Sequence, residues 1–285
     1  MTFVEWIRII LIGIIEGITE WLPISSTGHM LLFDQIFPTT APEVFTPEFN
    51  DVFMVVIQLG AILAVLTCFF GRLNPVSRQK TREEKKSTWS LWGKVIVGCL
   101  PAAVAGLLFD DWMEEHLYNY AVIAAMLIVY GVLFIVLEIR NRRRTFTVQT
   151  VDALTYRHAL IIGIIQVLSL IPGTSRSGVT ILGAMLIGCS RSVAAEYTFF
   201  LAIPVMIGAS GFRIVKYFID GSTFTVMQVA VMLAAMAVAY VVSMLAIKFL
   251  MKFVRRHDFK IFGVYRIALG VLVLALFPTV FGITL

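Results

Sequence analysis

The hydrophobic residues of this chain form long blocks that are separated by short polar segments. About 20 apolar residues in a helix are enough to cross the hydrocarbon core of a bilayer, which is ~30 Å thick. Blocks of this length predict six transmembrane helices, at residues 50–71, 88–109, 118–138, 194–217, 225–250 and 261–283.

Two further apolar regions, residues 2–37 and 158–189, are each interrupted near the middle by proline, glycine, serine and threonine. The interruptions read EGITEWLPISSTGH at 16–29 and QVLSLIPGTSRSG at 166–178. A spanning helix broken in this way leaves main-chain polar groups unpaired, which lipid does not tolerate. We therefore expect two re-entrant helix–loop–helix segments whose tips are buried in protein or line an aqueous cavity.

The two interrupted regions also resemble each other, at an offset of about 150 residues. In the resulting alignment residues 13–16 match 163–166, residues 23–26 match 172–175, and residues 58–61 match 206–209.

Each copy would contain one re-entrant hairpin and three spans, and because three is odd, the second copy must be inverted in the membrane. We predict an all-α polytopic membrane protein that forms a single integral domain. Repeat one lies at about 1–140 and repeat two at about 158–285, with a basic cytoplasmic linker at about 140–157. Proteins of this kind usually place their site near the midplane, where the broken segments meet.

Composition agrees with this fold class. Hydrophobic residues make up 59% of the 285 residues, charged residues make up 14%, and the mean hydropathy is +0.90. Soluble domains are roughly half apolar and a quarter charged, so a soluble fold is excluded. The net charge of +5 does not indicate nucleic-acid binding, because the basic residues lie in short loops between apolar blocks.

The charge of the loops predicts the orientation of the chain. Residues 34–51 and 110–116 carry acidic residues but no lysine or arginine. Basic residues gather instead at 72–86, 140–144 and 252–260. By the positive-inside rule the basic loops are cytoplasmic, so the acidic segments and both termini face outward.

Glu16 and Glu20 are the first candidates for chemistry. They are four residues apart, so on a helix they share one face. Two carboxylates in a poorly hydrated site must share a proton or hold a cation, and Mg²⁺ or Ca²⁺ suits oxygen ligands beside phosphates. The simpler alternative is a pair that water solvates near the outer face.

The first loop supplies hydroxyls and an imidazole: Ser25, Ser26, Thr27 and His29. A hydroxyl within reach of a base is the minimal activated nucleophile. His29 could be that base, a general acid or the phosphoryl acceptor itself. Turns and helix caps use the same residue types, so this loop alone is weak evidence.

The second loop places an arginine among glycine and hydroxyl residues: Gly173, Thr174, Ser175, Arg176 and Ser177. The guanidinium group is a planar fork of donors that matches phosphate oxygens. A helix starting near Ser177 would point its N-terminal amides at the same place. The alternative is a structural ion pair, for which Glu20 is one candidate partner.

Other polar residues are weaker candidates. Gln58 lies inside a predicted span, where an amide more often bridges helices than contacts a substrate. Arg213 and Lys216 lie at the outer end of the fourth span and do not fit the charge pattern, and nothing in the sequence explains them.

Together these motifs resemble the undecaprenyl-diphosphate phosphatases, which are also called bacitracin resistance proteins. The resemblance covers essentially the whole chain, including VIQLGAILAV at 56–65 and YRIALG at 265–270. It implies an enzyme that converts undecaprenyl diphosphate into undecaprenyl phosphate and inorganic phosphate, which recycles the lipid carrier for cell-wall synthesis and confers bacitracin resistance. The family's motifs fall on Glu16 and Glu20, on residues 25–29 and on residues 175–177.

From these residues we expect phosphoryl transfer that depends mainly on charge neutralisation. Glu16 and Glu20 would hold a divalent cation, Mg²⁺ or Ca²⁺, or handle protons, and Arg176 would bind phosphate. Ser26 is the preferred nucleophile, activated by Glu20 or His29, and His29 as the direct nucleophile stays open. The residues expected to bind the substrate are Ser25, Thr27, Gly173, Thr174, Ser175 and Ser177.

The competing hypothesis is a transporter or flippase for an anionic polyprenyl lipid or for phosphate, because inverted repeats are common in transporters. The convergence of nucleophile, base, carboxylate and arginine favours the enzyme. The expected partners are a polyprenyl diphosphate and the lipid bilayer, and a homodimer is compatible with the sequence. We expect a multi-pass protein of the bacterial inner (plasma) membrane whose active site opens to the outer, periplasmic face.

Overall fold

The computed structural model describes the backbone of residues 1–279 and, in that range, every side chain except those of Asp110, Asp111, Glu114 and Thr279. This part of the chain is almost entirely helical, and its extended pairing is limited to one isolated bridge between Val148 and Cys189. The helices are α1 (Phe3–Thr19), α2 (Ser26–Ile36), α3 (Pro47–Val56), α4 (Gln58–Cys68), α5 (Phe70–Leu73), α6 (Arg82–Leu117), α7 (Tyr120–Asn141), η1 (Val151–Ala153), α8 (Tyr156–Gln166), η2 (Val167–Leu170), α9 (Arg176–Leu186), α10 (Arg191–Ile219), α11 (Val226–Phe253) and α12 (Lys260–Thr279).

Among the described residues, six helical segments are long and apolar enough to cross a membrane, so the predicted multi-pass architecture is confirmed. The first segment combines α3 and α4, which meet at Ile57. Large apolar side chains are exposed along these helices, as a lipid-facing surface requires. The six segments are Pro47–Cys68, Arg82–Phe109, Tyr120–Asn141, Arg191–Ile219, Val226–Phe253 and Lys260–Pro278.

Both interrupted regions form the expected helix–loop–helix. In the first, α1 ends at Thr19 and α2 begins at Ser26; in the second, η2 ends at Leu170 and α9 begins at Arg176. The 11 residues of α2, α8 and α9 each give a helix about 16 Å long, roughly half of the hydrocarbon core. These helices are too short to span the membrane, so the loop of each hairpin lies within the protein.

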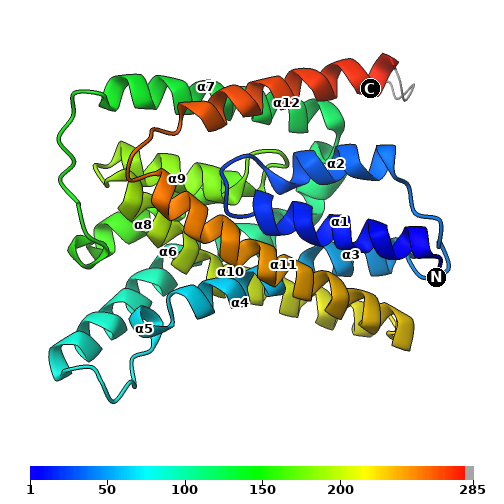
Figure 1. Ribbon diagram of the computed structural model, residues 1–285, viewed down its shortest axis with the longest axis horizontal. Coiled ribbons are helices and arrows are strands. Elements are labelled where there is room, and N and C mark those ends of the chain that lie inside the picture. The colour runs from blue at the N-terminus through cyan, green and yellow to red at the C-terminus, as the bar shows by residue number, and fades with distance from the viewer. Residues whose placement is uncertain (280–285) are drawn as a thin grey trace.

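Each hairpin packs against a long helix from the other half of the chain. Helix α1 lies against α11, and α8 lies against α6. Glycines permit the close approach: a Cβ on Gly163 would collide with the carbonyl oxygen of Gly98, and one on Gly13 would lie 2.8 Å from that of Ala235. Helices α7 and α12 also pair along one edge of the molecule (Figure 1). This reciprocal packing is consistent with two inverted repeats.

The structure corrects the predicted register between the two loops. Ser25 and Ser175 both cap a helix, both have positive φ angles (73° and 69°), and each accepts a hydrogen bond from the amide three residues further on. These two serines are therefore equivalent, and the predicted match of Ser26 to Ser175 was wrong by one residue. It aligned the prolines of the loops, but the second loop has one more residue between its proline and its cap. The equivalent of Ser26 is Arg176.

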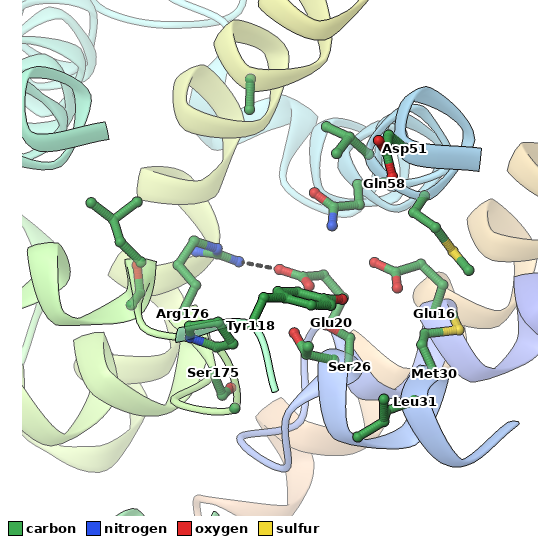
Figure 2. Close-up of a pocket in the computed structure, with 18 of the residues that line it drawn as sticks. Glu16, Glu20, Ser26, Met30, Leu31, Asp51, Gln58, Tyr118, Ser175 and Arg176 are labelled. Atoms are coloured by element: carbon green, nitrogen blue, oxygen red, sulfur yellow. Dashed lines mark hydrogen bonds and ion pairs between the residues drawn. The ribbon is translucent and has the colours of Figure 1, made fainter. Parts of the chain in front are cut away.

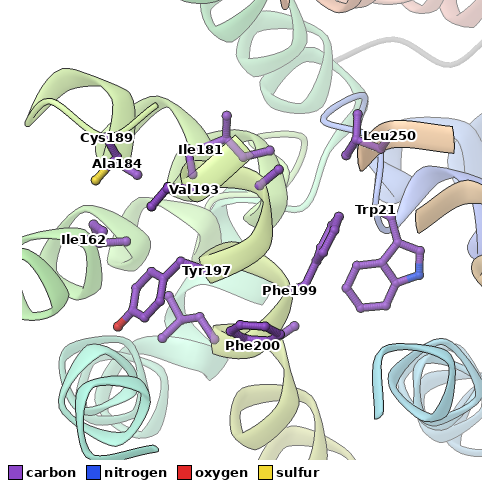
Figure 3. Close-up of a cluster of buried hydrophobic side chains, with 14 of the residues drawn as sticks. Trp21, Ile162, Ile181, Ala184, Cys189, Val193, Tyr197, Phe199, Phe200 and Leu250 are labelled. Carbon is purple, nitrogen blue, oxygen red and sulfur yellow. The ribbon is translucent and has the colours of Figure 1, made fainter. Parts of the chain in front are cut away.

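The largest apolar core joins the second hairpin to the first loop (Figure 3). Tyr197, Phe199 and Phe200 of α10 are fully buried in it, as is Ile162 of α8. Trp21 of the first loop is also fully buried, and its ring meets Phe199 edge to face with centroids 5.3 Å apart. Aromatic side chains bury large areas and pack with specific geometry. Trp21 therefore anchors the first loop against α10.

The end of the molecule that carries α5 and the linker after α7 lies opposite the end that carries the N-terminus (Figure 1). Arg78 and Glu43 are exposed and belong to a basic and an acidic segment. If the basic end is cytoplasmic, an impermeant thiol reagent should label Glu43→Cys in intact cells, while Arg78→Cys reacts only after permeabilisation. Labelling of Arg78→Cys in sealed cells would show that the orientation is reversed.

Candidate active site

A cavity of about 600 Å³ opens where the two loops meet (Figure 2). Its wall combines α1 to α4 with the second loop and α10. Binding sites for small molecules are usually ~300–1,000 Å³, so the space suits a polar headgroup. The described charged residues that line it are Glu16, Glu20, Asp34, Asp51, Arg176 and Arg213.

Two helix N-termini converge on this cavity. Ser26 is the first residue of α2, Arg176 is the first residue of α9, and both line the cavity. The first turn of a helix presents free amides and the positive end of the helix dipole, which favour an anion. Ser25 and Ser175 have positive φ angles, which are unusual for residues other than glycine. Strained backbone positions of this kind often occur at functional sites.

Arg176 is held from three sides. Its Nη2 donates to Glu20 Oε1 at 2.8 Å, and its Nη1 donates to the carbonyl oxygen of Thr198 at 3.1 Å. The guanidinium carbon lies 6.0 Å from the ring centroid of Trp21. Both members of the ion pair are largely buried, with 11% and 7% of their side chains exposed. Burial strengthens the interaction, so the guanidinium is rigidly placed at the edge of the cavity.

Glu16 lies one turn before Glu20, and its side chain points into the cavity (Figure 2). The residue is only 2% exposed, and its Oε1 has no hydrogen-bond partner. A buried carboxylate needs a proton or a cation. No group of three acidic, histidine or cysteine residues able to hold an ion by itself occurs in the described chain. The unpartnered oxygen of Glu16 fits a cation such as Mg²⁺ or Ca²⁺, which Glu16 and Glu20 would hold.

The structure divides the predicted site residues into two groups. Those that line the cavity are Glu16, Glu20, Ser26, Thr27, Gly173, Ser175 and Arg176. Those that do not are Ser25, His29, Thr174 and Ser177. The Ser25 hydroxyl caps α2, the Ser177 hydroxyl lies 3.2 Å from that of Ser175, and Thr174 is fully buried. The second group therefore shapes the loops and does not face the cavity.

His29 faces α12. Its Nδ1 lies 2.7 Å from the carbonyl oxygen of Ser25, and its Nε2 lies 2.7 Å from the hydroxyl of Tyr265. Both ring nitrogens thus have partners in the protein. Ser26, in contrast, lines the cavity, and its hydroxyl is near enough to Glu20 to interact with that carboxylate.

Arg266 of α12 connects the two loops. It is fully buried, and its guanidinium donates to the carbonyl oxygens of Pro23 at 3.3 Å, Gly173 at 2.9 Å and Thr174 at 2.9 Å. A fourth bond reaches the carbonyl oxygen of Met126 at 3.4 Å. One side chain therefore sets the distance between the loop that carries Ser26 and the loop that carries Arg176.

Comparison with known proteins agrees with this geometry. The family model described as bacitracin resistance protein BacA matches residues 9–272. The chain belongs to this family. A relative from Enterococcus faecalis is 54% identical over 96% of this chain and 98% of its own length. A relative from Streptococcus thermophilus is 53% identical over 95% of this chain and 93% of its own length. One from Streptococcus mutans is 52% identical over 99% of this chain and 100% of its own length. All three relatives are named undecaprenyl-diphosphatase.

Sequence reasoning missed three residues in or beside this cavity. Gln58 was expected to bridge helices, but its side chain points into the cavity, next to the irregularity at Ile57 (Figure 2). Arg213, unexplained by the charge pattern, lines the cavity. Arg266 was overlooked, although an arginine inside a predicted span is itself a functional signal.

Replacement of Arg266 tests its role as a connector. Arg266→Met preserves bulk but leaves several buried carbonyl groups without a donor, each costing about 1–3 kcal/mol. We expect a lower unfolding temperature and at least a tenfold loss of turnover. Intrinsic tryptophan fluorescence during heating in detergent measures the first, and phosphate release measures the second. An Arg266→Met protein with wild-type stability and turnover would show that the connection is dispensable.

Proposed function

We propose that this chain hydrolyses undecaprenyl diphosphate to undecaprenyl phosphate and inorganic phosphate. The observation that carries the proposal is the juxtaposition of Arg176, Glu20 and Ser26 in one cavity at two helix N-termini. Membership of the BacA family and the name shared by the relatives support a phosphatase over a transporter. A carrier would need the anion site but not a nucleophile beside a carboxylate.

Substrate binding begins with charge. The terminal phosphate takes the place of Glu20 at the guanidinium of Arg176, because the diphosphate offers oxygens to the same planar fork. The main-chain amides at the starts of α2 and α9 bind further phosphate oxygens. Glu20 is thereby released from its ion pair and is free to act on Ser26.

Bond making and breaking then involve one hydroxyl. Glu20 accepts the proton of the Ser26 hydroxyl as Oγ attacks the terminal phosphorus, and the bond from that phosphorus to the bridging oxygen breaks. Undecaprenyl phosphate leaves with the bridging oxygen. Water, deprotonated by the carboxylate of the pair that is still ionised, then attacks the phosphoserine. The bond from phosphorus to Oγ breaks, and Oγ takes back the proton that Glu20 holds, which restores Ser26 and yields inorganic phosphate. His29 is not needed as the nucleophile, because its two nitrogens are bound to Ser25 and Tyr265.

Glu16 and Glu20 are the residues that would hold a divalent cation. The unpartnered oxygen of Glu16 and the shared helical face of the two carboxylates support this assignment. When bound, the cation supplies neutralisation of the negative charge on the phosphates. Glu16 and Glu20 would then bind the cation, and Arg176 would orient the diphosphate.

The surroundings of the cavity support a position for the lipid tail and an opening on the outer face of the membrane. Apolar residues complete its lining, including Met30, Leu31, Val205 and Met206, and they suit the first isoprene units. Asn50, from the acidic segment 34–51 assigned to the outside, also lines it. The site accordingly opens to the outer face of the bacterial plasma membrane.

The direct test of this function uses purified protein in detergent with undecaprenyl diphosphate. We expect one inorganic phosphate per lipid, with undecaprenyl phosphate identified by mass spectrometry. Ser26→Ala should lose activity by about 10²-fold or more if Oγ is the nucleophile. Lipid movement across vesicles without phosphate release would favour the carrier and overturn the proposal.

The glutamate pair gives a second prediction. Glu20→Gln keeps size and polarity but removes the base and one cation ligand, so turnover should fall roughly 10²–10⁴-fold. Binding of the lipid diphosphate should fall much less, because Arg176 remains.

Chelation should abolish wild-type activity, and Mg²⁺ or Ca²⁺ should restore it. Glu138→Gln is the matched control, because Glu138 is also a buried partner of an arginine, Arg191, but does not line the cavity. Chelator-insensitive, undiminished turnover in Glu20→Gln would mean that the pair is structural.

Arg176→Lys gives a third prediction. Lysine keeps the charge but has one nitrogen, so it cannot contact Thr198 and a phosphate with the same fixed geometry. We expect turnover to fall about 10²-fold while the protein still inserts and folds, as judged by size-exclusion chromatography. A fully active lysine variant would show that a point charge is sufficient.

A further inference from the structure

The dipeptide Tyr265-Arg266 on α12 contacts both loops, although neither residue lines the cavity. Arg266 binds main-chain carbonyl groups, as described above. Tyr265 contacts His29 instead, with its hydroxyl 2.7 Å from Nε2 and the two rings stacked at 5.6 Å between centroids. Tyr265 is 45% exposed on a helix that crosses the membrane. A tyrosine hydroxyl in such surroundings needs a hydrogen-bond partner, and His29 is the one it has.

The two hydrogen bonds of His29 determine its tautomer. The carbonyl oxygen of Ser25 can only accept, so Nδ1, at 2.7 Å, must carry the proton. In the neutral ring Nε2 is then an acceptor, and the Tyr265 hydroxyl donates to it. The ring is therefore fixed at both ends, between the cap of α2 and α12.

This arrangement acts on Ser26 through the main chain. Ser25 has a φ of 73°, a conformation that a serine does not hold without support from its surroundings. The carbonyl group of Ser25 is adjacent to the nitrogen of Ser26, so its direction sets where the Ser26 side chain points. His29 holds that carbonyl group, and Tyr265 holds His29.

We propose that Tyr265 is a positioning residue that acts through His29 to hold the Ser25–Ser26 peptide, and that the imidazole itself takes no part in bond making. The inference deepens the proposed function and rests on it where turnover is measured. It assigns a physical task to the sequence YRIALG: its tyrosine orients the nucleophile, and its arginine holds the two loops together.

The kinetic test is a double-mutant cycle. Tyr265→Phe removes only the hydroxyl, so kcat should fall about tenfold while KM changes little, because misplacement of a reacting group affects the transition state. His29→Asn keeps a donor near the Ser25 carbonyl but cannot reach Tyr265. It should show a similar loss, and the double variant should be no worse than either single variant.

A matched control is Tyr240→Phe. Tyr240 is a half-buried tyrosine of α11 whose hydroxyl lies 3.3 Å from that of Thr67, and it does not line the cavity. Loss of its hydroxyl should leave kcat unchanged.

Three results would overturn the proposal. Activity of His29→Asn 10²–10⁴-fold below that of Tyr265→Phe would mean that the ring does chemistry. Losses that multiply in the double variant would mean that the residues act independently. A wild-type kcat in both Tyr265→Phe and Tyr240→Phe would mean that the contact between Tyr265 and His29 has no effect on catalysis.

A second measurement does not depend on catalysis. Nitrogen-15 spectra of protein labelled at histidine, with His29 assigned through His29→Asn, should show a protonated Nδ1 and an unprotonated Nε2. Tyr265→Phe should move the Nε2 signal and leave the tautomer of the other three histidines unchanged. A protonated Nε2, or an Nε2 signal that ignores Tyr265→Phe, refutes the proposal. If the wild type releases no phosphate from any lipid diphosphate, the proposed function fails, while these spectra still decide whether the pair exists.

Discussion

The buried guanidinium of Arg266 is the constraint on which the site depends. A fully buried arginine is costly unless its donors find acceptors. Both terminal nitrogens of Arg266 donate to carbonyl groups, which belong to the two re-entrant loops and to α7, while its Nε has no partner. The carbonyl groups of the two loops are main-chain groups that would otherwise lack partners, because they lie at breaks in helices. The guanidinium group of Arg266 and the carbonyl groups of the loops therefore stabilise each other, which fixes the loops at one separation.

That separation matters because neither loop is a complete site. Ser26 and the glutamates come from one half of the chain, and Arg176 comes from the other. The halves interlock through α1 against α11 and α8 against α6, with glycines at the crossings. Because the contacts are between backbones, small movements are resisted, and the strained serine caps are held in place.

The charges of the cavity form a set that one ligand can complete. Arg176 is paired with Glu20, whereas Glu16 retains a buried oxygen without a partner. A diphosphate with a divalent cation would supply an anion for the arginine and a cation for the carboxylates. Substrate binding, as proposed, would in this way free Glu20 from its ion pair with Arg176.

The sequence alone determined the membrane class, the six spans and the two broken hairpins, because these depend on hydrophobic length and on proline and glycine in apolar blocks. It also indicated Glu16, Glu20 and Arg176, since charge is rare and expensive inside a membrane. It could not determine which side chains of a loop face the cavity. His29 and Ser26 belong to the same short motif, yet one turns toward α12 and the other toward Glu20. The choice is made by Tyr265 and Arg266, more than 200 residues away in the chain, and by a one-residue difference between the loops that the motif alignment concealed. Only the tertiary structure decided these directions, because a side chain at a helix cap takes its direction from the partners that packing brings to it.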